Sequence, residues 1–122
     1  MSLMVDSDQR LAYFLSQELS ESNCKFVFEN VYEAVRECLD ALLALEGYKS
    51  FSHQASIAFA KDRSILSARE ARMLDRLREI RNRSKYYGDD VSFAIASEEV
   101  PLMHGMAKQL RHVLLQKLRP KE

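Results

Sequence analysis

Apolar residues recur along the chain at spacings of three, four and seven, the period of amphipathic helices. No segment alternates apolar and polar positions in the way that strands do. The predicted helices run from Ser7 or Asp8 to Leu19, from Cys24 to Glu46, from Ser50 to Lys61, from a cap at Ser64 or Ser67 to Gly88, and from Ser97 to Lys117. We therefore expect an all-α protein, an up-and-down bundle of four to five helices that forms a single domain over residues 1–122.

Residues that begin and end helices stand at the predicted boundaries. The segment Ser67–Glu70 has the form of a capping box. Gly47 and Gly88 follow their helices as C-terminal glycines do. Pro101 would lie near the first turn of the last helix, where proline is best tolerated.

The inner face of each helix follows from the same spacing. The second helix has two adjoining apolar stripes, so it should be central and contact several neighbours or a second subunit. These stripes comprise Val27, Val31, Ala34, Val35, Cys38, Leu42 and Leu45, and then Phe28, Tyr32, Leu39 and Leu43. In the third helix, the residues expected to face inward are Phe51, Ala55, Ala58 and Phe59.

A single cation lies close to the apolar stripe of the fourth helix. At about 100° per residue, Arg81 is only about 60° from the centre of that stripe, so we expect it on the flank of the buried face. An unpaired buried charge is very costly, so Arg81 should have a carboxylate partner, a partner across a dimer interface or an anionic ligand. The stripe itself comprises Leu66, Met73, Leu77, Ile80 and Ser84.

Composition restricts the setting of the protein. No apolar run is long enough for a transmembrane helix, and the first residues do not resemble a secretory signal. Cys24 and Cys38 would lie about 21 Å apart on a continuous helix, too far for an internal disulfide. A cytoplasmic location without membrane contact is therefore expected.

The charge is uneven although the net charge is zero. Residues 1–50 carry a balance of −5, and residues 61–87 carry a balance of +5. This asymmetry favours either an anionic ligand at the basic segment or pairing between acidic and basic helices.

Most catalytic and cofactor motifs are absent from the sequence. There is no glycine-rich phosphate loop, and His53, His104 and His112 lack metal-ligand spacing. We therefore expect neither a metal ion nor a cofactor. The remaining candidate is the segment Arg81–Tyr87, which combines guanidinium groups suited to phosphate with an amide and two rings that can stack.

The segment Leu77–Gly88, together with Gly47–Ala55 upstream, resembles HEPN domains, which are small all-helical proteins associated with nucleotides or RNA. The resemblance covers about Glu29 to Gly88 well, and the last helix in pattern only. The signature of that family is an arginine, often followed by a polar residue, and then a histidine after four to six further residues. In active members the two residues form a metal-independent ribonuclease site between two subunits.

Arg81 and Asn82 match the start of that signature, but Tyr86 and Tyr87 stand where the histidine is expected. A tyrosine side chain, whose usual pKa is about 10, is a poor base near neutral pH. His53 is a weak substitute candidate, because it would have to approach Arg81 from the third helix.

The expected function is that of a non-catalytic or weakly active HEPN module that binds RNA or a nucleotide, or that serves as an interaction module of the toxin–antitoxin type. In this interpretation, the ligand is held by Arg81, Asn82, Lys85, Tyr86 and Tyr87. One alternative is a metal-independent ribonuclease that uses Arg81 with Tyr86 or His53. Another is a structural partner of a separately encoded nucleotidyltransferase. The resemblance and the apolar second helix also imply a homodimer.

Overall fold

The computed structural model describes residues 9, 13, 18–49, 51–88 and 90–118. These residues form four long helices and no strand, so the all-α bundle is confirmed for this part of the chain. The predicted helix from Ser7 or Asp8 to Leu19 lies mostly outside the described residues. Leu19 itself is not helical, although it packs against the core. The helices are α2 (Cys24–Leu45), α3 (His53–Asp62), α4 (Ala68–Tyr87) and α5 (Phe93–Lys117).

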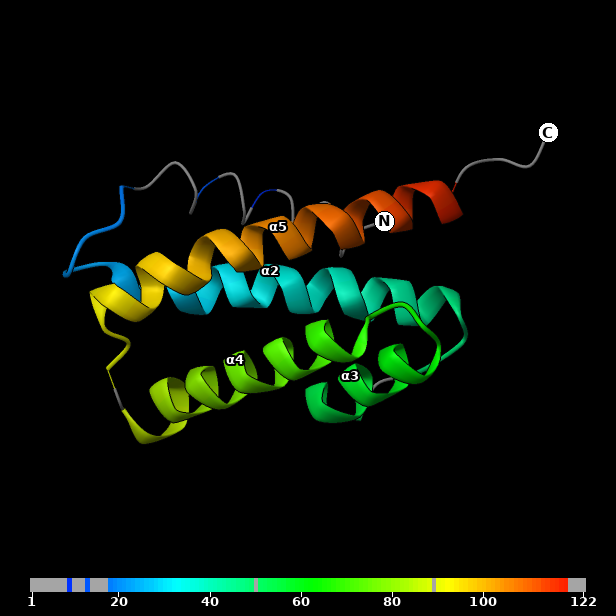
Figure 1. Ribbon diagram of the computed structural model, residues 1–122, viewed down its shortest axis with the longest axis horizontal. Coiled ribbons are helices and arrows are strands. Elements are labelled where there is room, and N and C mark those ends of the chain that lie inside the picture. The colour runs from blue at the N-terminus through cyan, green and yellow to red at the C-terminus, as the bar shows by residue number, and fades with distance from the viewer. Residues whose placement is uncertain (1–8, 10–12, 14–17, 50, 89, 119–122) are drawn as a thin grey trace.

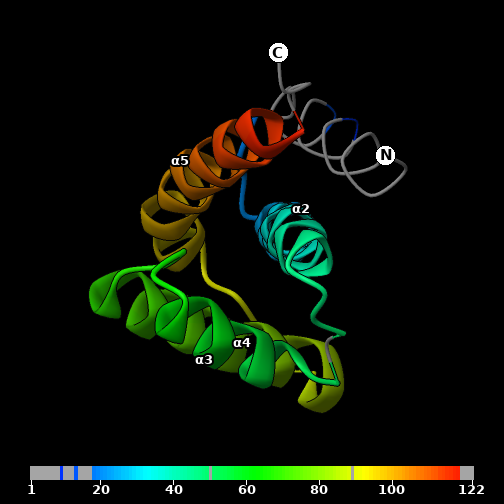
Figure 2. The same cartoon turned by 90° about the vertical axis from the view of Figure 1, so that its right-hand side faces the viewer.

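Helix α2 occupies the centre of the bundle, with α5 on one side and the α3–α4 pair on the other (Figures 1 and 2). α5 runs parallel to α2, since Cys24 Sγ lies 3.1 Å from the Val91 carbonyl at one end and Lys117 Nζ lies 3.0 Å from Glu46 at the other. α4 runs opposite to both (Figure 1). The segment between α2 and α3 returns along the bundle, so α3 points the same way as α2 and the helices do not simply alternate.

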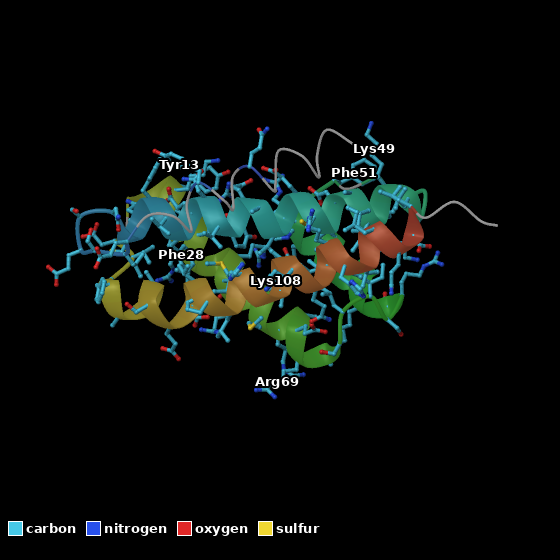
Figure 3. The ribbon with its side chains drawn as sticks, turned by 90° about the horizontal axis from the view of Figure 1, so that it is seen from above. Tyr13, Phe28, Lys49, Phe51, Arg69 and Lys108 are labelled. Carbon is cyan, nitrogen blue, oxygen red and sulfur yellow. The ribbon has the colours of Figure 1, made fainter. Side chains whose placement is uncertain are left out.

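The apolar faces of α2 are buried within the single chain. The predicted bounds of α2 are correct to one residue. Phe28, one of its buried residues, lies between α2 and α5 in Figure 3. Leu45 was expected inside but is exposed. At the end of the helix, Gly47 adopts φ 79°, and the N–H of Tyr48 bonds the Leu43 carbonyl at 2.9 Å. This is the Schellman arrangement that a C-terminal glycine permits.

Helix α3 begins later than predicted, and its inner face is different. Ser52 caps it by accepting a hydrogen bond from the Ala55 N–H. Phe51 therefore precedes the helix and is 89% exposed (Figure 3). Ala58 is exposed too, and Ala55 and Phe59 are only half-buried. The buried residues are small or aliphatic, which allows close packing: Ser56, Ile57 and Ala60.

Helix α4 has the predicted ends. Ser67 and Glu70 form the capping box, with both hydrogen bonds present at 2.9 and 3.1 Å, and Gly88 ends the helix in the left-handed region at φ 71°. Its buried stripe is rotated from the prediction, since Met73 and Ile80 are only half-buried. The buried positions are Ala71, Leu74, Leu77, Arg81 and Ser84.

Helix α5 starts four residues before the predicted Ser97, at Phe93, because Ser92 caps it by accepting from the Ile95 N–H. Pro101 therefore lies in the helix interior rather than in its first turn. It is tolerated on the exposed side of the helix, where the carbonyl that lacks its donor can be reached by solvent. No helix in the described part of the chain is both long and apolar enough to cross a membrane.

Candidate functional site

A small polar hollow lies where the middle of α2, the first residues of α3 and the second half of α4 meet. Its volume is about 230 Å³. We call it the arginine hollow because three guanidinium groups line it, and none of the described residues that line it is acidic. Its lining residues are Tyr32, Arg36, Ser52, His53, Gln54, Arg78, Arg81, Asn82 and Tyr86.

Arg81 lies in the buried stripe of α4 and is only 7% exposed, so the prediction that it lies on the flank is wrong. That prediction took its stripe through Met73 and Ile80, but the buried face of α4 is rotated toward Ala71 and Leu74 and includes the cation itself. Of the partners considered, the structure supplies a carboxylate: Arg81 Nη2 donates to Glu33 on α2. Its Nη1 lies 3.3 Å from the Asn82 side-chain oxygen, and the guanidinium lies over the Tyr32 ring.

Two further arginines were not singled out from the sequence. Arg36, one turn after Tyr32 on α2, lies 3.6 Å from Glu33 and 3.7 Å from Asp40. Arg78, one turn before Arg81 on α4, donates from Nε to Asp75 at 3.0 Å. The partner carboxylates orient the guanidinium groups but do not line the hollow.

These ion pairs account for part of the charge asymmetry. The basic helix α4 pairs with the acidic α2 through Arg81 and Glu33, and with α5 through Arg76 and the buried Glu99. The hydrogen bond to Glu99 raises the pKa of Arg76. Pairing between acidic and basic helices, one of the two alternatives, is thus present in the structure.

His53 enters the arginine hollow as the first residue of α3, and its ring meets Tyr32 edge to face. The Tyr32 hydroxyl is hydrogen-bonded to His53 Nδ1. Burial raises the pKa of that hydroxyl, which keeps its proton, and its hydrogen-bond partner among the described residues is Nδ1. Tyr32 therefore donates to Nδ1, and the ring proton lies on Nε2.

The Nε2 atom of His53 is buried and has no hydrogen-bond partner in the described part of the chain. Buried N–H groups without an acceptor are uncommon in proteins. Burial, and then the positive charges of the three arginines of the hollow, lower the pKa of His53 to about 3. At neutral pH the imidazole is thus an uncharged donor.

The start of α3 adds to this set of donors. The Ser52 side chain and carbonyl serve the N–H groups of Ala55 and Ser56, so the N–H groups of His53 and Gln54 have no partner within the helix. The positive end of the helix dipole lies here. The hollow thus combines donors from three helices, an arrangement that suits an anion.

The other predicted site residues lie at or outside the rim. Tyr86 lines the hollow but is 66% exposed. Lys85 lies beside it, with Nζ 5.7 Å from the centre of its ring, and does not line the hollow. Tyr87 is exposed and also lies outside. The structure therefore brings together Arg81, Asn82, Tyr86 and His53, but not Lys85 or Tyr87.

A larger hollow, of about 450 Å³, lies between α4 and α5 and is lined by Arg69, Arg72, Arg76, Glu70, Met73 and Leu102. None of the buried polar atoms that lack a partner among the described residues belongs to it. Nor do the described His, Cys, Asp and Glu side chains form a group of three that could hold a metal ion. The arginine hollow is therefore the stronger candidate.

Comparison of the chain with models of known families, with curated proteins and with solved structures found no match in any of the three.

We predict that His53 makes stability depend on pH. Because its pKa of about 3 in the folded chain lies below the usual value near 6.5, the unfolded chain takes up the proton first as pH falls. The contribution of the uncharged His53 to the free energy of unfolding is fully present above about pH 6.5. It is lost as the pH falls toward 3, at up to about 1.4 kcal/mol per pH unit. Urea unfolding at several pH values should therefore show that the free energy of unfolding falls less steeply with falling pH in His53→Gln than in the unaltered chain. Parallel curves of unfolding free energy against pH for the two proteins would contradict the lowered pKa of His53.

Proposed function

We propose that this protein is a non-catalytic HEPN-type module that binds RNA or a nucleotide by holding a phosphate group in the arginine hollow. The observation that carries the proposal is that three guanidinium groups and the first residues of α3 line one small hollow, whose described lining contains no acidic residue. Guanidinium groups bind phosphate oxygens through paired N–H donors, and helix N-termini bind the same group.

The size of the hollow indicates which part of a ligand it takes. Sites for whole small molecules are usually about 300–1,000 Å³, and the hollow has only about 230 Å³. A phosphate fits inside, while a sugar and base remain outside. There the exposed ring of Tyr86 offers a surface on which a base can stack.

The state of His53 favours binding over catalysis. Its Nδ1 is engaged by Tyr32, and its low pKa makes it a weak proton acceptor. A general acid or base is most efficient when its pKa lies near the working pH. The imidazole is therefore better suited to donate a hydrogen bond than to exchange a proton.

The second candidate function is a metal-independent ribonuclease, and one observation favours it. His53 lines the same hollow as Arg81 and Tyr86, although it comes from another helix. A bound phosphate would favour the charged imidazole and raise its pKa.

The proposals about partners rest on the HEPN resemblance. A homodimer, a nucleotidyltransferase partner and a toxin–antitoxin role derive from it alone, because the apolar faces of α2 that suggested a second subunit are buried within the chain. The proposed cytoplasmic location is supported by Cys24 and Cys38, which are both thiols on the continuous α2.

We predict that Arg36→Gln weakens the binding of single-stranded RNA about tenfold, the effect of losing one charge-assisted hydrogen bond. The side chain of Arg36 is 40% exposed, so the fold should tolerate the change. Fluorescence anisotropy at several salt concentrations gives the slope of the logarithm of the binding constant against the logarithm of the salt concentration. The magnitude of this slope should also fall by about 0.7 in the variant. Arg69→Gln is the matched control, since Arg69 points away from the bundle in Figure 3. Equal losses in both variants would contradict binding at the hollow.

We further predict that the purified protein leaves single-stranded RNA uncut at neutral pH in the presence of a chelator, because no group in the hollow is suited to proton transfer there. Gel analysis of labelled RNA tests this. Cleavage that disappears in both Arg81→Lys and His53→Ala would establish the ribonuclease instead. Cleavage that survives both changes would point to a contaminating nuclease and leave the prediction standing.

A further inference from the structure

A groove runs along the surface between the first half of α4 and the middle of α5. It consists of the hollow of about 450 Å³ described above and a second hollow of about 570 Å³, and the two adjoin at Glu70. Its lining extends from Ala68 to Arg76 on α4, and from Leu102 to Gln109 on α5. Each of these stretches is about 10–12 Å long, or about two turns of helix. We call this surface the α4–α5 groove.

The α4–α5 groove leaves aliphatic side chains partly exposed. Leu102 is 47% exposed on α5, and Met73 on α4 is half-buried; both line the first hollow. Ile65, which is also half-buried, lines the second hollow beside Ala68. The described lining of both hollows contains no aromatic ring. This surface therefore suits the aliphatic side chains of a protein, whereas single-stranded nucleic acid is usually held by rings on which its bases stack.

The groove also carries cations without a carboxylate partner. Arg76 is paired with Glu99, but neither Arg69 nor Arg72 forms an ion pair within the described part of the chain. Both are exposed, and Arg69 points away from the bundle in Figure 3. Lys61, at the second hollow, is exposed and equally unpaired among the described residues. An acidic partner complements these charges.

Glu70 distinguishes between two kinds of acidic partner. It lies where the two hollows meet, and one of its carboxylate oxygens accepts the Ser67 N–H as part of the capping box. A nucleic-acid strand carries a negative charge at every residue, so a strand lying in the groove would bring phosphates past this carboxylate. A peptide is charged only where its sequence places an acidic residue, and a neutral residue can lie opposite Glu70.

The shape of the groove favours a helical partner. The described residues form no strand, so they offer no sheet edge to which an extended peptide could add. The groove is instead bounded by two helices that run in opposite directions (Figure 1). A third helix can pack along such a groove with apolar residues at spacings of three, four and seven.

We propose that the α4–α5 groove is a docking site for an acidic amphipathic helix of a partner protein. The apolar stripe of that helix packs on Leu102 and Met73, and carboxylates beside the stripe pair with Arg69 and Arg72. The groove shares no lining residue with the arginine hollow. It therefore gives the chain a second binding surface, beyond the proposed function.

The test uses three synthetic helical peptides of equal length. The first has a leucine stripe flanked by glutamates, the second has lysines in place of the glutamates, and the third has serines in place of the leucines. Fluorescence anisotropy gives the affinity of each labelled peptide for the full chain. The first should bind at least about tenfold more tightly than either of the others. Equal affinities, or no saturable binding of the first peptide, would overturn the proposal.

Variants of the chain locate the binding site. Arg72→Gln should weaken the binding of the acidic leucine peptide about threefold, the effect of losing one exposed ion pair, and Leu102→Ser should weaken it about tenfold. Both side chains are exposed, and thermal unfolding establishes that each variant is folded. Arg36→Gln is the matched control, because it removes the same charge outside the groove. Equal losses in Arg36→Gln and Arg72→Gln would reduce the effect to net charge and contradict the proposal.

Single-stranded RNA separates this proposal from the proposed function. RNA bound at the arginine hollow should leave the peptide in place, because the two surfaces share no lining residue. If RNA displaces the peptide and loses affinity in Arg72→Gln but not in Arg36→Gln, the groove is a nucleic-acid surface and both proposals are wrong. If Arg36→Gln changes no RNA affinity while the peptide results hold, only the proposed function is wrong.

Discussion

The ion pair between the buried Arg81 and the half-buried Glu33 is the interaction on which the site depends. Arg81 is almost fully buried in the apolar stripe of α4, and Glu33 on the central helix α2 accepts its hydrogen bond. Removing Glu33 would leave the buried guanidinium without its carboxylate partner, which destabilises a folded chain. The pair therefore favours one placement of α4 against α2, and it places a cation where the core would otherwise be apolar.

One turn of α2 organises the rest of the arginine hollow. Tyr32 binds His53 at the start of α3, and Glu33 binds Arg81 on α4 through one oxygen while its other oxygen lies 3.6 Å from Arg36. Side chains within five consecutive residues thus fix groups on three helices. The cost of burying these charges is offset by their mutual pairing, and the described lining of the hollow contains the three arginines but no acidic residue.

The sequence predicted the features that depend on local chemistry and missed those that depend on packing. The capping glycine Gly88 ends α4 as predicted, because helix ends are specified by a few adjacent residues. Phe51 was placed inside by helical spacing, but α3 buries Ser56, Ile57 and Ala60 instead and leaves that ring exposed. Arg81 was recognised as a site residue, yet its central position and its proximity to His53 depend on contacts between helices that no local pattern encodes.

The claim that the arginine hollow binds phosphate is tested most directly by nuclear magnetic resonance of the full chain during a titration with adenosine monophosphate. If phosphate binds in the hollow, the His53 ring and the Arg36 and Arg81 side-chain signals should show saturable shifts, with the Arg69 signals unchanged. The His53 ring should show a clear change, because it lines the hollow in which the phosphate binds. Absence of a saturable shift at His53, or equal shifts at Arg69 and Arg36, would contradict phosphate binding at the hollow.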